Sequence, residues 1–342
     1  MGTKPRVSSG WGPPSYKPSG RMADYAATKG TLLLGEIQRH MMREADKPSD
    51  RRQDIIHPSE MAHTGWCPRS TYFRIKACRE ASDPFLKPRE SVGVQLLNIF
   101  DEGHYIHDKW QRRLWDMGLL GGQWKCLFCG GKFNAISPEK CPLRRCSVGK
   151  ELLQYAEIGL QSPEYLIYGH ADGGIPSKKA LIEIKSVGAG TVRVANPELY
   201  KRFTDGQKID LPGLWKGIEE PFPDHINQGQ IYLALCNMMN LPYERIVFLY
   251  ESKFSQGAKE FVVDFDIDIA SGLLESASAI KSALDGLTDP PECPYDGCTD
   301  CEGKDDGTKI EKPGLGTGIP ENARAPRTIK RGSGTPRRIV RT

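Results

Sequence analysis

Three side chains in the middle of the chain have the types and spacing needed for phosphodiester hydrolysis. Asp172 precedes a Gly-Gly pair, and Glu183 and Lys185 follow it in the segment Ala-Leu-Ile-Glu-Ile-Lys-Ser. Two carboxylates suit Mg²⁺ or Mn²⁺, which prefer oxygen ligands. Such an ion polarises a phosphoryl group and lowers the pKa of a bound water. Lys185 could orient or deprotonate that water, or neutralise charge that develops on the phosphate.

Alternation along the strand expected around Glu183 predicts how these groups are positioned. Successive side chains of a strand point to opposite faces, so Glu183 and Lys185 share one face while Ile182 and Ile184 can bury on the other. A hairpin-like return would bring Asp172 beside them at a sheet edge. An exposed strand with a surface ion pair is the competing interpretation of these residues.

Two predicted helices add polar residues to this set. Gly103 and His107 are one helical turn apart, so a glycine gap and an imidazole share a face. Gln228 and Tyr232 share one face of a later helix in the same way. Taken singly, a helix histidine and a polar helix face have ordinary structural explanations.

Together, the patterns G-x-x-x-H, G-H-x-D-G, E-I-K and Q-x-x-x-Y resemble, in this order, the RecB-type branch of the PD-(D/E)XK nucleases. The most similar members are Cas4-like exonucleases, including phage-encoded ones, and the resemblance covers about residues 55–303. It implies a metal site with three side-chain ligands and one backbone carbonyl, formed by His107, Asp172, Glu183 and Ile184. Lys185 would then be the catalytic lysine, and Gln228 and Tyr232 would position the DNA strand or Lys185.

Eight of the ten cysteines fall into two groups. The first has the local spacing C-x₂-C-x₁₁-C-x₄-C and consists of Cys126, Cys129, Cys141 and Cys146. Four cysteines in a segment with few core-forming residues are typical of a zinc ribbon, and a segment this small could scarcely fold without its metal. Incidental cysteines are the alternative. The lysines and arginines of this segment could also contact the DNA backbone.

The second group joins distant parts of the chain: Cys67, in a Trp-Cys-Pro-Arg context, and Cys293, Cys298 and Cys301. In Cas4-like and AddB-like nucleases, one upstream cysteine and three downstream ones hold a [4Fe–4S] cluster, so the resemblance implies such a cluster here. The spacing C-x₄-C-x₂-C departs from the family's C-x₂-C-x₅-C. Zinc on the same four thiolates is therefore an alternative, and unligated structural cysteines are another.

Helices interleaved with strands predict a mixed α/β core, and the resemblance implies the restriction-endonuclease-like (PD-(D/E)XK) type. Helices are expected at 30–46, 95–119, 224–240 and 269–284, and strands at 165–168, 180–184, 245–250 and 260–265. No element is predicted in the polar segment 188–223. The expected organisation is a flexible N-terminal segment at 1–24, a helical part at 25–122, a zinc-ribbon-like insertion at 123–149, the nuclease core with its cysteine cluster at 150–303, and a disordered basic tail at 304–342.

Composition limits the classes of function. The 342 residues carry a net charge of only +4, but seven basic residues and one acid lie between Glu321 and Thr342. That tail is either a solvated disordered segment or an arm that binds phosphates without sequence preference. No run is apolar enough for a membrane helix, and no signal-peptide core is visible. We therefore expect a cytoplasmic protein, of a bacterium or of a phage-infected host, without a membrane partner.

The sequence thus predicts a Mg²⁺- or Mn²⁺-dependent deoxyribonuclease acting on DNA that is single-stranded or has a free end, in recombination or repair. Exonuclease action follows only from the resemblance, and a recombination or helicase partner is left open. The alternatives are a structure- or sequence-specific endonuclease with the same residues, a non-catalytic DNA-binding adaptor with structural metal sites, and an RNA nuclease.

Overall fold

The computed structural model describes residues 32–45, 47, 51–86, 93–295, 298 and 301. The predicted flexible segment 1–24 and the predicted basic tail 304–342 lie outside the described residues. Within the described part, no helix combines the length and the apolar character needed to span a membrane.

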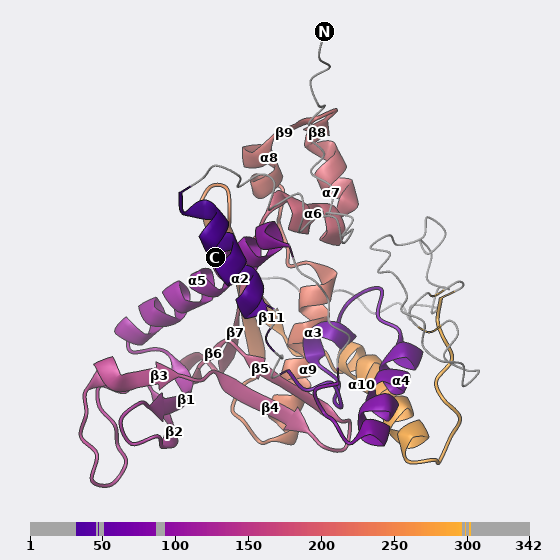
Figure 1. Cartoon of the computed structure of the whole chain (residues 1–342), viewed down its shortest axis with the longest axis horizontal. Coiled ribbons are helices and arrows are strands. Elements are labelled where there is room, and N and C mark those ends of the chain that lie inside the picture. Colours follow the sequence, from indigo (N-terminus) through magenta and orange to yellow (C-terminus); the bar gives the residue numbers. More distant parts are fainter. Residues whose placement is uncertain are drawn as a thin grey trace.

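A mixed seven-stranded sheet forms the centre of the fold (Figure 1). Six strands follow the order β11-β10-β7-β6-β1-β2, and β3 pairs with β1. The strands are β1 (Gly121–Cys126), β2 (Lys132–Ile136), β3 (Leu153–Tyr155), β6 (Gly173–Ile175), β7 (Ala180–Val187), β10 (Arg245–Ser252) and β11 (Ala258–Asp264). Only the β7–β10 pair is parallel among these. A parallel pair needs a long crossover connection, and the segment between β7 and β10 supplies it.

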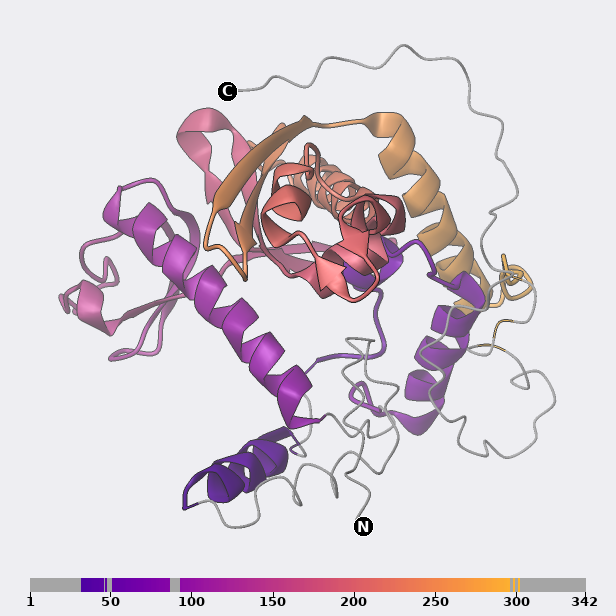
Figure 2. The same ribbon diagram turned by 90° about the horizontal axis from the view of Figure 1, so that it is seen from above.

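Helices cover both faces of this sheet. The helices of the described residues are α2 (Leu34–Ala45), α3 (Pro58–Met61), α4 (Pro68–Ala81), α5 (Val94–Asp116), α6 (Ala189–Ala195), α7 (Pro197–Arg202), α8 (Leu211–Lys216), α9 (Pro223–Met238) and α10 (Ile267–Leu284), of which α5 and α9 contact the sheet on opposite faces. Short 3₁₀ turns lie at Lys150–Leu152 and Pro176–Lys178. In Figure 2, α9 lies between the curved strands and α10, and every residue from Gln228 to Cys236 is buried. Helix α9, the longest of the four helices that connect β7 to β10, is therefore an interior helix.

Strand β7 divides two hydrophobic cores. Leu181 and Val187 pack with α9 and α10 residues in the larger core, whereas Ile182 and Ile184 pack in a second core with Ile106 of α5 and the fully buried Trp124 of β1. The predicted alternation is confirmed, because neighbouring side chains of β7 enter opposite cores. Trp124 is buried in a segment in which the composition suggests few core residues.

Mixed α/β architecture is confirmed, but two parts of the sequence-based assignment are wrong. The strand expected at 165–168 is β5 (Ile167–Ala171), which forms a hairpin with the unpredicted β4 (Ile158–Ser162). The segment 188–223 is not devoid of elements, since it contains α6, α7, α8 and the hairpin of β8 (Thr204–Asp205) and β9 (Lys208–Ile209). These helices are short, and two of them begin at side-chain caps: Asn196 Oδ1 accepts from Leu199 N at 3.0 Å at the start of α7, and Asp210 Oδ1 accepts from Gly213 N at 3.0 Å at the start of α8. Cap chemistry satisfies helix ends without any long hydrophobic periodicity.

Candidate active site

Asp172 forms hydrogen bonds with residues of both α5 and β7. It lies between β5 and β6 and is buried, with 7% of its surface exposed. Its Oδ1 lies 3.1 Å from His107 Nδ1, and its Oδ2 accepts from Ile184 N at 2.6 Å. Gln111 Nε2, one turn along α5 from His107, donates to the Asp172 carbonyl at 2.9 Å. Burial disfavours the charged imidazole, but the contact with Asp172 outweighs this effect and raises the pKa of His107.

Glu183, Lys185, Gln228 and Tyr232 form a second polar group, on the face of β7 opposite to Ile182 and Ile184. Glu183 Oε1 accepts from Lys185 Nζ at 2.8 Å and from Gln228 Nε2 at 2.9 Å. Gln228 Oε1 accepts from Lys185 Nζ at 2.9 Å, and Gln228 Nε2 also donates to the Tyr232 hydroxyl at 3.0 Å. Gln228 thereby fixes the relative positions of the acid and the lysine. Burial raises the pKa of Tyr232, which keeps its hydroxyl neutral.

One oxygen of Glu183 is left over. Glu183 is 3% exposed, and its buried Oε2 has no hydrogen-bond partner among the described residues. Burial and the charge of Asp172 raise the pKa of Glu183 to about 7, against the opposing effect of Lys185. A buried polar atom without a partner is costly and calls for an explanation. A cation bound at this oxygen would satisfy it.

The setting of these groups corrects the expected sheet-edge position and argues against the competing interpretation, a surface ion pair. β7 is not at a sheet edge, because it lies between β10 and β6. The Glu183–Lys185 contact is not a surface ion pair, because Glu183 is buried. A Cβ at Gly103 would lie 3.5 Å from Ser186 Oγ, an ordinary contact distance, so sterics do not require glycine there.

One side of β7 nevertheless lacks a strand partner along part of its length. β6 pairs only with residues 180–182 of β7, so Ile184 has no β6 partner and its N–H binds the Asp172 carboxylate instead. In a strand the N–H and C=O of one residue point toward the same neighbour. The Ile184 carbonyl therefore faces the same side as Asp172.

The predicted metal ligands do not form one compact cluster. Among the described residues, the sets of three or more His, Cys, Asp or Glu whose ligand atoms all lie within 4.8 Å of one another are both cysteine sets. His107 contacts Asp172, and the charges of both act on Glu183, but Glu183 makes its hydrogen bonds to Lys185 and Gln228. An imidazole, two carboxylates and one unpartnered carboxylate oxygen nonetheless fit a divalent cation by donor type.

Sequence analysis missed one further acid of this region. Glu157, between β3 and β4, has a pKa raised to about 7 by burial and by the charge of Asp172, opposed by His107 and by a hydrogen bond with Gln111. It belongs to none of the four motifs. Its φ of 58° is uncommon for a residue with a side chain, and such conformations collect at functional sites, but this signal is absent from a sequence.

Glu157 leads to a prediction for pH. Its raised pKa means that the folded protein holds this proton more tightly than the unfolded chain, so its stabilising contribution is present below about pH 4.5 and is lost as the pH rises through about 7. Without added divalent metal, the melting temperature should fall between about pH 5 and pH 8, and Glu157→Gln should reduce that fall. Differential scanning calorimetry at several pH values measures both. An unchanged pH profile in the variant would contradict the assignment.

The local cysteine group is assembled as the sequence predicts. Cys126 and Cys146 have sulfurs 3.7 Å apart, and Cys129 and Cys141 have sulfurs 3.9 Å apart. All four lie within 4.8 Å of one another. Backbone N–H donors, that of Cys129 foremost, lower the pKa of Cys126 to about 7. This segment is continuous with the central sheet, because Gly121 at the start of β1 pairs with Gly174 of β6.

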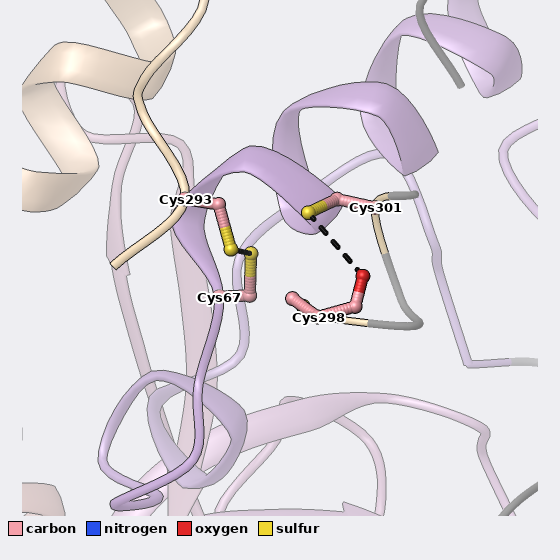
Figure 3. A group of neighbouring side chains, drawn as sticks. All are labelled: Cys67, Cys293, Cys298 and Cys301. Atoms are coloured by element: carbon pink, nitrogen blue, oxygen red, sulfur yellow. Dashed lines mark hydrogen bonds between the residues drawn. The ribbon is translucent and has the colours of Figure 1, made fainter. Parts of the chain in front are cut away.

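The distant cysteine group is also assembled (Figure 3). Cys67 Sγ lies 3.6 Å from Cys293 Sγ, and Cys298 and Cys301 complete a set within 4.8 Å. Cys67 caps α4, where its sulfur accepts from Ser70 N at 3.4 Å. Both cysteine groups are thus candidate metal sites on geometry alone.

Comparisons with known proteins identify no family. No family model matches the chain, and no curated protein does. Among solved structures, an alkaline exonuclease from Laribacter hongkongensis, LHK-Exo, is similar at 12% identity and a TM-score of 0.39, covering 72% of this chain and 93% of the exonuclease. The same enzyme in complex with dAMP gives a TM-score of 0.38 at 12% identity, with the same coverage of both chains. The protein SSO0001 gives 0.33 at 14% identity, covering 76% of this chain and 89% of SSO0001. Similarity at this level carries no conclusion about activity.

Proposed function

We propose that the protein is a divalent-metal-dependent deoxyribonuclease. The observation that carries the proposal is the buried Glu183: one oxygen is held by Lys185 and Gln228, while the other has no partner among the described residues. A purely structural buried acid would be expected to have both oxygens satisfied. The meeting of residues from four separate sequence motifs around β7 supports the same function.

The proposed ligands are His107, Asp172, Glu183 and the Ile184 carbonyl. When bound, Mg²⁺ or Mn²⁺ would polarise the scissile phosphoryl group and lower the pKa of a water. The protein's own part is positioning. Asp172 is fixed through both oxygens, by His107 and by the Ile184 N–H, which hold its carboxylate in one orientation beside β7.

Lys185 is the proposed group that acts on the reacting oxygen atoms. An ammonium has three donors, and the contacts among the described residues use two of them, to Glu183 and Gln228. The remaining donor is available to a water or a phosphate oxygen, and 20% of the side chain is exposed. Lys185 would therefore orient the attacking water or stabilise charge that develops on the phosphate, and Gln228, held by Tyr232, would keep it in place.

The finer proposal is an exonuclease of Cas4/RecB-like type that acts on single strands or free ends in recombination or repair. End-labelled linear DNA, single-stranded DNA, closed circular DNA and RNA should be tested with Mg²⁺, Mn²⁺, Ca²⁺ and no added metal. We expect Mg²⁺ or Mn²⁺ to support degradation of the linear and single-stranded DNA, with the circle and the RNA intact. Cleavage of the circle would instead show an endonuclease, and no cleavage with any metal would favour a DNA-binding adaptor.

A further inference from the structure

The spacing of the four distant cysteine sulfurs distinguishes between a single metal ion and an iron–sulfur cluster. Cys67 Sγ and Cys293 Sγ are 3.6 Å apart, and the sulfurs of all four residues lie within 4.8 Å of one another. Tetrahedral zinc, with bonds to sulfur of about 2.3 Å, sets its thiolates about 3.8 Å apart. In a [4Fe–4S] cluster each thiolate binds a different iron at an outer corner, so the thiolates are about 6 Å apart. The observed set is too compact for the four-iron cluster.

The local cysteine group provides an internal reference for this comparison. Its sulfurs are 3.7 and 3.9 Å apart in the pairs Cys126–Cys146 and Cys129–Cys141, and the same 4.8 Å limit holds for the whole set. That group has the spacing of a zinc ribbon. The two groups therefore share one geometry although one is local and the other joins the two ends of the described chain.

We propose that Cys67, Cys293, Cys298 and Cys301 bind one tetrahedral Zn²⁺, and that the protein carries two zinc ions and no iron–sulfur cluster. This assignment departs from the cluster that the sequence resemblance implies. It agrees instead with the C-x₄-C-x₂-C spacing of the last three cysteines, which differs from the family pattern.

The surroundings of the site suit an anionic four-thiolate centre. Cys67 is at the N-terminus of α4 and accepts the Ser70 N–H, and helix N-termini favour negative charge. Arg69, in the first turn of α4, donates to the Pro291 carbonyl at 3.2 Å and so brings a positive charge to the segment that precedes Cys293.

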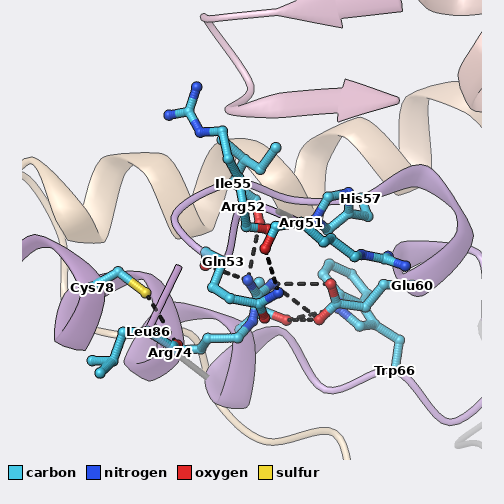
Figure 4. A network of polar contacts seen from close by, with 11 residues as sticks. Arg51, Arg52, Gln53, Ile55, His57, Glu60, Trp66, Arg74, Cys78 and Leu86 are labelled. Atoms are coloured by element: carbon cyan, nitrogen blue, oxygen red, sulfur yellow. Dashed lines mark hydrogen bonds and ion pairs between the residues drawn. The ribbon is translucent and has the colours of Figure 1, made fainter. Parts of the chain in front are cut away.

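The helix that carries Cys67 is itself held firmly. Arg74 donates to both carboxylate oxygens of Glu60, at 3.1 and 2.9 Å, and to the carbonyls of Ile55 and Gln53 (Figure 4). One guanidinium nitrogen contacts the Glu60 carboxylate and the other contacts the two carbonyls, so Arg74 ties α4 to both segments. Cys67 is thus presented by a fixed element, whereas Cys293 follows the end of α10.

The zinc site connects to α9 by a short chain of contacts. Tyr295 hydroxyl donates to the Thr64 carbonyl at 2.7 Å, and Thr64 N donates to Asp224 Oδ1 at 3.1 Å. Asp224 is in the first turn of α9, one turn before Gln228. A metal at the four cysteines would therefore help to hold the N-terminal turn of α9 in place.

The decisive experiment is metal analysis of the full chain purified with and without oxygen, by mass spectrometry for zinc and iron together with a visible spectrum. We expect two zinc ions per chain, no iron and no visible absorption in either preparation. Cys67→Ser and Cys129→Ser should each lose one zinc. Cys78→Ala changes a buried cysteine outside both groups, so this control should keep two.

Two results would overturn the proposal. One is about four irons per chain, with visible absorption that Cys67→Ser removes. The other is a single zinc together with a Cys67–Cys293 disulfide detected by peptide mapping without reduction. If Cys67→Ser does not fold, replacement of zinc by Co²⁺ in the unmodified protein gives the answer, since two tetrahedral thiolate sites produce twice the cobalt absorption of Cys129→Ser. None of these measurements depends on DNA cleavage.

Discussion

Lys185→Ala is expected to reduce DNA cleavage by about 10³-fold or more while leaving DNA binding and folding largely intact. The ammonium is the one cationic group held between Glu183 and Gln228 among the described residues. Loss of a preorganised donor that acts on the reacting oxygen atoms typically costs about 10²–10³ in kcat, and loss of water orientation adds to this. Single-turnover cleavage of end-labelled DNA with Mn²⁺ measures the chemical step without product release.

Lys259→Ala is the matched control for this variant. Lys259 lies on β11 and donates to the backbone carbonyls of Lys216 and Ile218, so it is also a partly buried lysine with two acceptors. Its removal should leave the rate of cleavage within about twofold, because its hydrogen bonds are to backbone carbonyls and to none of the proposed site residues. Equal losses in both variants, or a Lys185→Ala variant that cleaves normally, would remove Lys185 from the reaction.

Glu183→Gln is expected to abolish cleavage and to raise the melting temperature at about pH 8. The carboxylate is buried, and even with Lys185 beside it the charged form is disfavoured, so that its pKa is raised to about 7. A neutral amide of the same shape avoids that cost at alkaline pH. The same change removes a proposed ligand, so Mn²⁺ affinity, measured by calorimetry or electron paramagnetic resonance, should fall by about tenfold or more.

A loss of cleavage together with a gain in stability would indicate that Glu183 is retained for function although it destabilises the fold. At about pH 4 the stability difference between the variant and the unmodified protein should shrink, because Glu183 is then protonated in the folded protein and, below its ordinary pKa of 4.5, in most of the unfolded chains as well. A variant that melts earlier at about pH 8 and still binds Mn²⁺ would identify Glu183 as a structural partner of Lys185.

Local patterns in the sequence predicted the parts of the site that local geometry determines. Alternation placed Glu183 and Ile182 on opposite faces of β7, and the structure has them in this arrangement. Helical spacing placed Gln228 and Tyr232 on one face of α9, where they hydrogen-bond to each other. The contact of His107 with Asp172 required the family resemblance, because a helix and a strand end meet here through tertiary packing alone.

Long-range pairing accounts for most of what could not be predicted. The central position of β7 depends on its parallel pairing with β10 across a connection that includes four helices, and no residue of β7 encodes its neighbour. The role of Glu157 as a buried acid of this region could not be predicted, because its neighbours in space, Asp172 and Gln111, are remote in sequence. The spacing of the cysteines along the sequence predicted which residues form each group. It could not predict how close their sulfur atoms lie, because that depends on the positions of the side chains.

The interior position of α9 has a consequence for how the protein should lose activity on heating. Segments that open locally are usually exposed and sparsely packed, whereas buried helices exchange their amide hydrogens only when the whole domain unfolds. Gln228 and Tyr232 lie on the fully buried stretch of α9. Thermal inactivation should therefore coincide with the cooperative melting of the domain, and no folded but inactive intermediate should accumulate below that temperature.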